Sequence, residues 1–234
     1  MSYTGVIING VDTLEEWGLI LLEDLKIGEA KLKSTWVNIP GADGSLNMSY
    51  GLTDGSPVFD MRTISFTLFA SGITKVGQRL IMRKAKDEAA VNEIRAALQA
   101  AYHGREVNVF LPDDSTHYFR GVLAVGDKSK FNSGQIPITL TAYPYRLKRA
   151  ETSVAVTIPS SGTITVTLDN EQRRVVPTIT TTGNLSVQKG SRTWAIEPGT
   201  TRLSGLYLDA GETELAMSGT AGTEVTITYQ EGRL

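Results

Sequence analysis

Few residues of this chain have the type and spacing that catalysis requires. The sequence contains no cysteine, which excludes thiol nucleophiles, thiolate metal sites and disulfides. Its two histidines are His103 and His117, and neither has the other at metal-ligand spacing. His103 lies in the last turn of a predicted helix, where a partly positive side chain suits the helix dipole. His117 follows a polar turn and is predicted to face solvent, so structural roles are favoured for both.

The acidic residues do not form a convincing catalytic pair. Asp113 and Asp114 are adjacent, and adjacent side chains on a strand or turn point apart, whereas an acid and a base must converge. We therefore favour a turn at this position. Asp43 lies between Gly41 and Gly44, but its loop lacks the lysine of a phosphate loop and the alternating acidic ligands of a calcium loop. The sequence predicts no enzyme activity, no cofactor and no metal site.

Two aromatic residues leave one alternative function open. Trp194 and Tyr207 lie in strand-like runs, and exposed aromatic rings on a β-sandwich can stack against sugars. Burial in a core is the favoured interpretation of both rings. Recognition of cell-surface glycans by the second half of the chain is the alternative hypothesis.

The charge balance argues against a polyanionic partner. The 23 basic and 25 acidic residues are spread along the chain and give a formal net charge of -2, so no sequence-specific nucleic-acid binding is expected. The first residues do not resemble a secretory signal, and the apolar run at 19–22 is far too short to cross a bilayer. We expect a soluble protein, made in a cytoplasm and not inserted in a membrane.

The elements expected in the first 150 residues are mostly strands. Residues 63–69 alternate polar and apolar side chains, which predicts a half-buried strand. Apolar residues recur at spacings of three and four over 86–103 and predict one helix, with Gly104 placed to end it in a left-handed conformation. Runs at 106–111 and 118–125 predict a hairpin, and a further strand is expected at 136–142.

Beyond residue 151 the composition changes to short, threonine-rich runs separated by turn residues. Such a pattern favours an antiparallel β-sandwich. We therefore predict a mainly β protein with two domains, 1–150 and 151–234. The expected strands of the second domain are 154–158, 163–168, 175–180, 185–188, 193–196, 201–208, 214–217 and 224–229.

Several short motifs, in this order, resemble those of the siphophage distal tail protein, a component of the tail tip. They are Trp17-Gly18-Leu19, Ile39 to Leu46 around the Pro-Gly-x-Asp-Gly-like loop, Arg62 to Phe66, Ala101 to Arg105, the acidic turn with Tyr118 to Gly121, Tyr143 to Arg146, and the C-terminal Tyr229 to Leu234. The residues carried over as candidate assembly-interface positions are Pro40, Gly41, Asp43, Gly44, Arg62, His103, Gly104, Arg105, Asp113, Asp114, Tyr118, Arg120, Tyr143, Pro144, Tyr145 and Arg146. Ala42 departs from the family loop, which often has arginine there, and no carbohydrate-binding insertion is present, so the chain resembles a short form.

The resemblance implies a structural subunit and not an enzyme. Its N-terminal, ring-forming (belt) domain would assemble into a hexameric ring, and its C-terminal domain would be a galectin-like sandwich. The implied partners are further copies of the chain, the tail tube protein, the tail hub or tail-associated protein, the tape measure protein and a receptor-binding protein. The implied location is the tail tip of a virion, after synthesis in the bacterial host cytoplasm. A ring subunit needs exposed edges and loops that fit its neighbour, and the long connections around 9–60 are expected to supply them.

Overall fold

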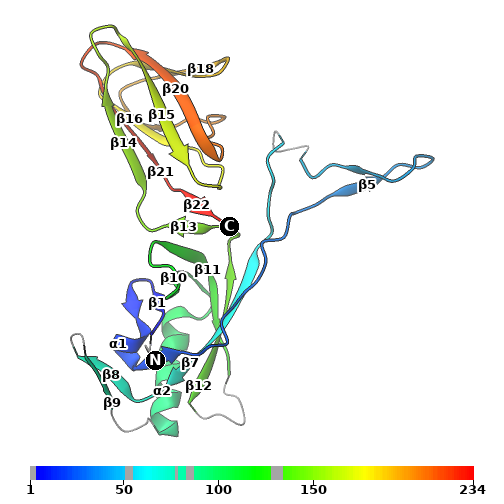
Figure 1. Ribbon diagram of the computed structural model, residues 1–234, viewed down its shortest axis with the longest axis vertical. Helices are drawn as coiled ribbons and strands as arrows, with labels where there is room; N and C mark the ends of the chain where they lie inside the picture. Colours follow the sequence, from blue (N-terminus) through cyan, green and yellow to red (C-terminus); the bar gives the residue numbers. More distant parts are fainter. Residues whose placement is uncertain (1–3, 51–54, 77–78, 83–86, 128–133) are drawn as a thin grey trace. The chain divides into compact units, whose positions relative to one another are not determined.

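The computed structural model describes the chain except for residues 1–3, 51–54, 77–78, 83–86 and 128–133. The chain divides into two compact units, Met1–Arg146 and Leu147–Leu234. It is mainly β, as the sequence predicts, and strands follow one another through both units (Figure 1). A short strand, β13 (Arg146–Lys148), spans the division.

The first unit is built on one antiparallel sheet with the strand order β2-β1-β10-β11-β12-β7-β3, and β4 pairs with β7 beside β3. Its centre is the pairing of β12 with β7, in which Ile138 lies opposite Phe66. These strands are β1 (Ile7–Ile8), β2 (Val11–Asp12), β3 (Leu19–Leu21), β4 (Lys26–Ile27), β7 (Arg62–Ala70), β10 (Arg105–Phe110), β11 (His117–Val125) and β12 (Gln135–Ala142). A separate hairpin consists of β8 (Ile73–Val76) and β9 (Arg79–Met82).

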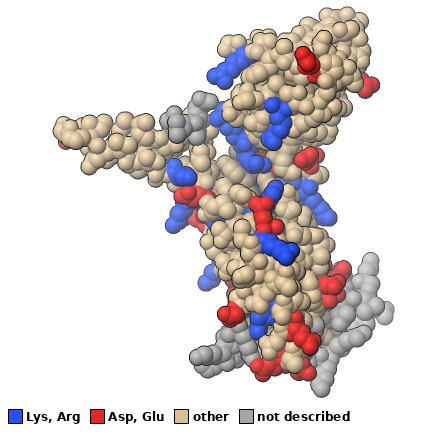
Figure 2. All heavy atoms as spheres, turned by 180° about the vertical axis from the view of Figure 1, so that it is seen from behind, with Lys and Arg blue, Asp and Glu red and all other residues tan. Residues whose placement is uncertain are grey.

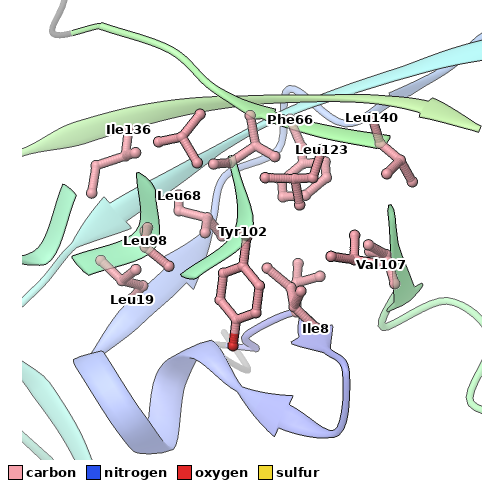
Figure 3. Packing of buried hydrophobic residues seen from close by; sticks show 14 of the residues in the cluster. Ile8, Leu19, Phe66, Leu68, Leu98, Tyr102, Val107, Leu123, Ile136 and Leu140 are labelled. Carbon is pink, nitrogen blue, oxygen red and sulfur yellow. The ribbon is translucent and has the colours of Figure 1, made fainter. Parts of the chain in front are cut away.

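Helix α2 (Glu88–Tyr102) packs against this sheet. Asp87, the N-cap residue, caps the first turn of the helix: its side chain accepts a hydrogen bond from the Ala90 amide at 2.9 Å. The apolar stripe predicted from the sequence is buried, and in Figure 3 Leu98 and Tyr102 lie among strand residues such as Leu68 and Leu123. The helix therefore covers one face of the sheet and closes the core. The first predicted helical residue, 86, lies outside the described residues.

A second helix was not expected from the sequence. Helix α1 (Thr13–Trp17) is only one turn long, which is too short for a hydrophobic period to reveal. Asp12 caps it by accepting from the Leu14 amide at 2.8 Å, and Gly18 ends it in a left-handed conformation with φ 67°. Trp17 at its end contacts the Tyr102 ring edge-on, with ring centroids 6.2 Å apart. The short helix thus covers one end of the core.

Between β4 and β7 the chain leaves the sheet and returns, forming an extension over residues 29–61 that we call the arm. Its base is a ladder in which the Lys33 amide donates to the Val58 carbonyl and the Asp60 amide to the Lys31 carbonyl. Farther out lies a hairpin of β5 (Trp36–Asn38) and β6 (Ser45–Asn47). Figure 1 shows this hairpin projecting outward beyond the start of β7 without folding back over the sheet.

The second unit consists of two four-stranded antiparallel sheets, with the orders β14-β21-β16-β19 and β15-β20-β17-β18. One core lies between them, to which the first sheet contributes Ile179 and Ile227 and the second contributes Leu215 and Met217. The predicted sandwich is therefore present. Its eight strands are β14 (Thr152–Thr157), β15 (Thr163–Asn170), β16 (Thr178–Thr181), β17 (Leu185–Lys189), β18 (Arg192–Ile196), β19 (Gly199–Arg202), β20 (Gly211–Gly219) and β21 (Glu224–Tyr229). A further short strand, β22 (Gly232–Arg233), lies outside both sheets and pairs with β13.

A polar cluster ties together the two ends of the second unit. The Glu231 carboxylate is almost fully buried, and it accepts from Lys148 Nζ at 2.6 Å and from the Thr152 hydroxyl. Burial pushes the pKa of Glu231 upward, but these hydrogen bonds outweigh it and hold the pKa below the usual value. Beside it, burial raises the pKa of Tyr229 to about 12, and the phenol donates to the Asp169 carbonyl at 2.5 Å. The first and last segments of the unit are thereby fixed to each other.

Candidate assembly surface

The arm displays large apolar side chains to solvent. Every residue from Lys31 to Met48 is exposed, and Trp36 keeps 60% of its surface accessible. Among the described residues, the exposed large hydrophobic side chains outside the arm are Val122, Tyr143 and Leu234. Those on the arm are Leu32, Trp36, Val37, Ile39, Leu46, Met48, Tyr50, Val58 and Met61. Apolar surface concentrated in this way is typical of protein interaction sites, since a monomer gains nothing from exposing it.

Charge is almost absent from the same segment. Asp43 is the sole charged residue between Lys33 and Asp54 in the sequence. It lies in the turn between β5 and β6, where Gly41 and Gly44 have φ values of 83° and 77°. In Figure 2 the projecting arm is tan over nearly all of its visible length. The predicted Pro40 to Gly44 loop is therefore the tip of the arm, and its Asp43 is the one charge in the outer part of the arm, residues 34–53.

At the base of the arm two arginines share one aromatic ring. Arg62 is the first residue of β7, and its guanidinium carbon lies 5.4 Å from the centroid of the Phe119 ring. The guanidinium carbon of Arg146 lies 4.8 Å from the same centroid. Phe119 is buried in β11, so both contacts are cation–π interactions at the edge of the core. We call Arg62, Phe119 and Arg146 the arginine pair site.

The two arginines differ in their acidic partners. Arg146 Nη1 lies 3.1 Å from Asp113 Oδ2 and 3.8 Å from Asp114 Oδ2. Arg62 is 94% buried, and the described part of the chain offers its guanidinium neither a hydrogen bond nor an ion pair; its Nε is fully enclosed. Burial, and then the charge of Arg146, lower the pKa of Arg62. Arg62 is therefore a buried cation whose charge no nearby carboxylate offsets.

The acidic turn is a local structure, as its sequence suggests. Asp114 Oδ1 accepts from the amides of Thr116 and His117 at 2.9 and 3.2 Å, and from the Thr116 hydroxyl at 2.6 Å. The expectation that His117 faces solvent is wrong. Its side chain is buried, with Nδ1 2.8 Å from the Thr116 hydroxyl and 3.2 Å from Asp114 Oδ2, because β11 begins at this residue and turns it inward.

The Tyr143 to Arg146 motif holds the base of the arm. Tyr145 meets Phe59 edge-on, with ring centroids 5.9 Å apart and planes at 90°. Pro144 is half-buried, and Tyr143 is exposed. Phe59 lies on the returning strand of the arm, where Leu32 forms a β-bridge with it. The motif therefore brings the arginine pair site and the root of the arm into one place.

Other motif residues lie on the surface of the sheet. Arg120 Nη2 contacts Glu106 Oε2 at 2.6 Å across β10 and β11. Hydrogen bonds from Arg120 and Tyr143 lower the pKa of the Glu106 carboxyl, and the same contact raises the pKa of Arg120. Tyr118 tilts against Phe110, with centroids 5.1 Å apart. Because this ion pair is solvent-exposed, it contributes little to stability and orders side chains on the sheet face.

The motif at the end of helix α2 has a structural role in the chain. His103 is the C-cap residue, and its Nδ1 accepts from the Val125 amide at 3.1 Å. Gly104 follows with φ 71°, as predicted, and its amide donates to the Leu123 carbonyl at 2.8 Å. Arg105 then begins β10 and is exposed. These residues join helix and sheet at the opposite end of β11 from Phe119.

The two glycan-contact candidates are engaged within the second unit. Trp194 is half-buried and packs against the core, and Tyr207 is half-buried beneath Arg174, whose guanidinium carbon lies 4.0 Å from the ring centroid. A shallow depression of about 270 Å³ lies on β15, β17 and β20. Hydroxyl and amide groups and apolar side chains both line it: Thr163, Ile164, Thr165, Ser186, Gln188, Ala216, Met217 and Ser218.

Within the described ranges, no group of three or more His, Asp or Glu side chains is placed to hold a metal ion. The helices described here include none with the length and apolar character of a membrane span.

Comparison with solved structures finds a match that extends over the whole chain. The crystal structure of SPP1 Dit (gp 19.1) aligns with 100% of this chain over 100% of its own length, with a TM-score of 0.61 and 12% sequence identity. The whole chain has the fold of SPP1 Dit. The resemblance predicted from the motifs is thereby confirmed at the level of fold. That protein is described as a paradigm of the hub adsorption apparatus in phages that infect Gram-positive bacteria.

The remaining comparisons add no argument about function. A de novo designed double-stranded β-helix aligns with 35% of this chain at 15% identity, and its TM-score of 0.26 carries no weight. No family model and no curated protein sequence matches the chain.

Proposed function

We propose that this protein is a structural, non-enzymatic subunit of a phage tail tip, which forms a hexameric hub ring through its first unit. The ring would join the tail tube protein to the tail hub or tail-associated protein, leave a channel for the tape measure protein, and carry a receptor-binding protein. The protein would be made in the bacterial host cytoplasm and end in the virion. The observation that carries this proposal is the fold shared with SPP1 Dit along both complete chains.

The arm supports self-association in particular. A closed ring forms when one surface of each copy fits a different surface of the next. The arm provides a projecting apolar surface, and the first unit provides a separate sheet with its own edges. Such an arrangement is suited to heterologous contacts, in which each subunit both gives an arm and receives one.

Two measurements test the proposal. Light scattering over a range of concentrations, with negative-stain images of the same fraction, should give six-membered closed rings with a central channel. In particles from the producing bacterium, gold-labelled antibody against this protein should mark the tip of the tail. Label confined to the capsid or absent from particles would overturn the proposed location. An enzyme-like activity lost on changing one carboxylate would overturn the non-enzymatic role.

Glycan recognition by the second unit is the second candidate function. The depression on β15, β17 and β20 supplies hydroxyl and amide groups that can pair with sugar hydroxyls. The rings of Trp194 and Tyr207 are not part of its lining, so aromatic stacking would not contribute there. Titration of the whole protein with host-wall polysaccharides, compared with a Gln188→Ala variant, should show saturable binding that the substitution weakens. A flat titration would remove this candidate.

A further inference from the structure

Arg62 poses an energetic problem that the isolated chain does not solve. A buried charge is normally paired, because removing a guanidinium from water is unfavourable unless hydrogen bonds and an opposite charge offset the loss. Arg62 has the ring of Phe119 beneath it, but no carboxylate contact in the described residues. A second cation, Arg146, lies over the same ring. Within the arginine pair site, Arg146 is paired with Asp113 and Asp114, and Arg62 is the cation without a carboxylate partner in the described residues.

Asp43, at the tip of the arm, is a carboxylate without a cationic partner in the described residues. It is exposed, it belongs to an otherwise uncharged apolar segment, and the described part of the chain gives it no ion-pair partner. A lone charge adds nothing to an apolar docking surface unless the partner presents the opposite charge at the matching position. The tip of the arm therefore lacks a cation.

The two sites cannot satisfy each other within one copy. At the base of the arm the Asp60 amide donates to the Lys31 carbonyl, and two residues later Arg62 begins β7. At roughly 3.3 Å per extended residue, the stretch from Lys31 to Asp43 covers up to about 40 Å. Because Figure 1 shows the hairpin of β5 and β6 projecting outward from the sheet, the tip lies away from the arginine pair site of its own chain.

We infer that Asp43 at the tip of one copy's arm binds the arginine pair site of a second copy, between Arg62 and Arg146. The carboxylate accepts hydrogen bonds from both guanidiniums, while Phe119 forms the floor of the site. The apolar side chains of the arm cover the neighbouring surface and exclude water, which strengthens the ion pairs. This contact joins two different surfaces of the same chain, so it propagates from copy to copy and can close into a ring. The inference rests on the self-assembly put forward as the protein's function.

A double-mutant cycle tests the pairing. The variants are Asp43→Asn, Arg62→Met and the combination, and the measured quantity is the dissociation constant of the assembly by sedimentation and light scattering. Each single change should weaken association about ten- to a hundredfold, the range for hydrogen bonds to charged groups. The two effects should be less than additive, and the residual effect of Asp43→Asn in the Arg62→Met background reports the contact that Arg146 still makes. Additive effects, or no effect of Asp43→Asn, would overturn the inference.

A crosslinking measurement keeps the test independent of the fold of the Arg62 variant. The chain has no cysteine, so Asp43→Cys and Asp113→Cys can be placed on separately tagged chains and joined with a short thiol-to-thiol linker. Asp113 contacts Arg146 and is half-exposed, so it reports on the arginine pair site. Mixed dimers should form between these two chains and not when Asp113→Cys is replaced by Ala101→Cys, at the His103 end of α2. Equal yields from both pairings would overturn the inference.

The outcomes separate this inference from the proposed function. Closed rings that tolerate Asp43→Asn would leave a ring-forming hub in place and exclude this contact. Specific crosslinks in a protein that is absent from tail tips would establish the contact and exclude the proposed location.

Discussion

Replacing Trp36 by serine should separate assembly from folding. Trp36 retains 60% of its surface in the isolated chain. A tryptophan side chain buries about 200 Å² when it is fully covered, so about 120 Å² remains to be covered by a neighbour. At about 25 cal/mol per Å² this area contributes about 3 kcal/mol to each contact. Association should weaken by about two orders of magnitude per contact.

The same substitution should leave the monomer nearly unchanged, because an exposed side chain contributes little to folding. Sedimentation equilibrium gives the association constant, and urea unfolding followed by circular dichroism gives the free energy of unfolding. Val122→Ser is the matched control, since Val122 is 44% exposed but lies on β11 and not on the arm. The reasoning is refuted if both variants associate equally well, or if Trp36→Ser lowers the free energy of unfolding by more than about 1 kcal/mol.

Gly121→Ala should destabilise the first unit by about 3 kcal/mol, because a Cβ there would lie 2.2 Å from the Thr141 carbonyl oxygen. Gly104→Ala meets no atom within 4 Å and should cost only the left-handed backbone strain, about 1 kcal/mol; equal losses in urea unfolding would contradict this. The raised pKa of Tyr229 means that the folded second unit holds this proton more tightly than the unfolded chain, so stability should fall between about pH 10 and about pH 12. Thermal unfolding of Tyr229→Phe should lack this part of the decline. The lowered pKa of Glu231 predicts the opposite sign, a loss of stability as pH falls below about 4.5, which Glu231→Gln should reduce.

The sequence predicted the parts of the fold whose pattern is periodic. The alternation at 63–69 became β7 (Arg62–Ala70), and the stripe of spacings three and four became α2 (Glu88–Tyr102). The run predicted at 201–208 is strand only at its start, in β19 (Gly199–Arg202). Its later residues Leu206 and Leu208 are buried in the core and belong to no strand, although Leu208 forms a single β-bridge with Val175. A short apolar run does not distinguish burial from strand pairing.

The candidate surface was predictable only in part. The connections around 9–60 were expected to contact a neighbour, and the exposed arm lies within them. The motifs named Arg62 and Arg146, but nothing in their spacing showed that both would meet over Phe119, because that contact joins three distant segments. Trp36 was not singled out. The signal that could have indicated it is the near absence of charge around an aromatic residue beside a glycine-rich turn.

Giving and receiving an arm on one chain also has a consequence for mixtures of subunits. A copy without its arm could still bind the arm of one neighbour at its arginine pair site. It would have no arm with which to bind the next copy. Each such copy would stop a growing row before it closed. A minority of truncated subunits would therefore prevent full-length subunits from closing into rings. Loss of the arm should then be a dominant defect, whereas loss of the whole protein should be recessive.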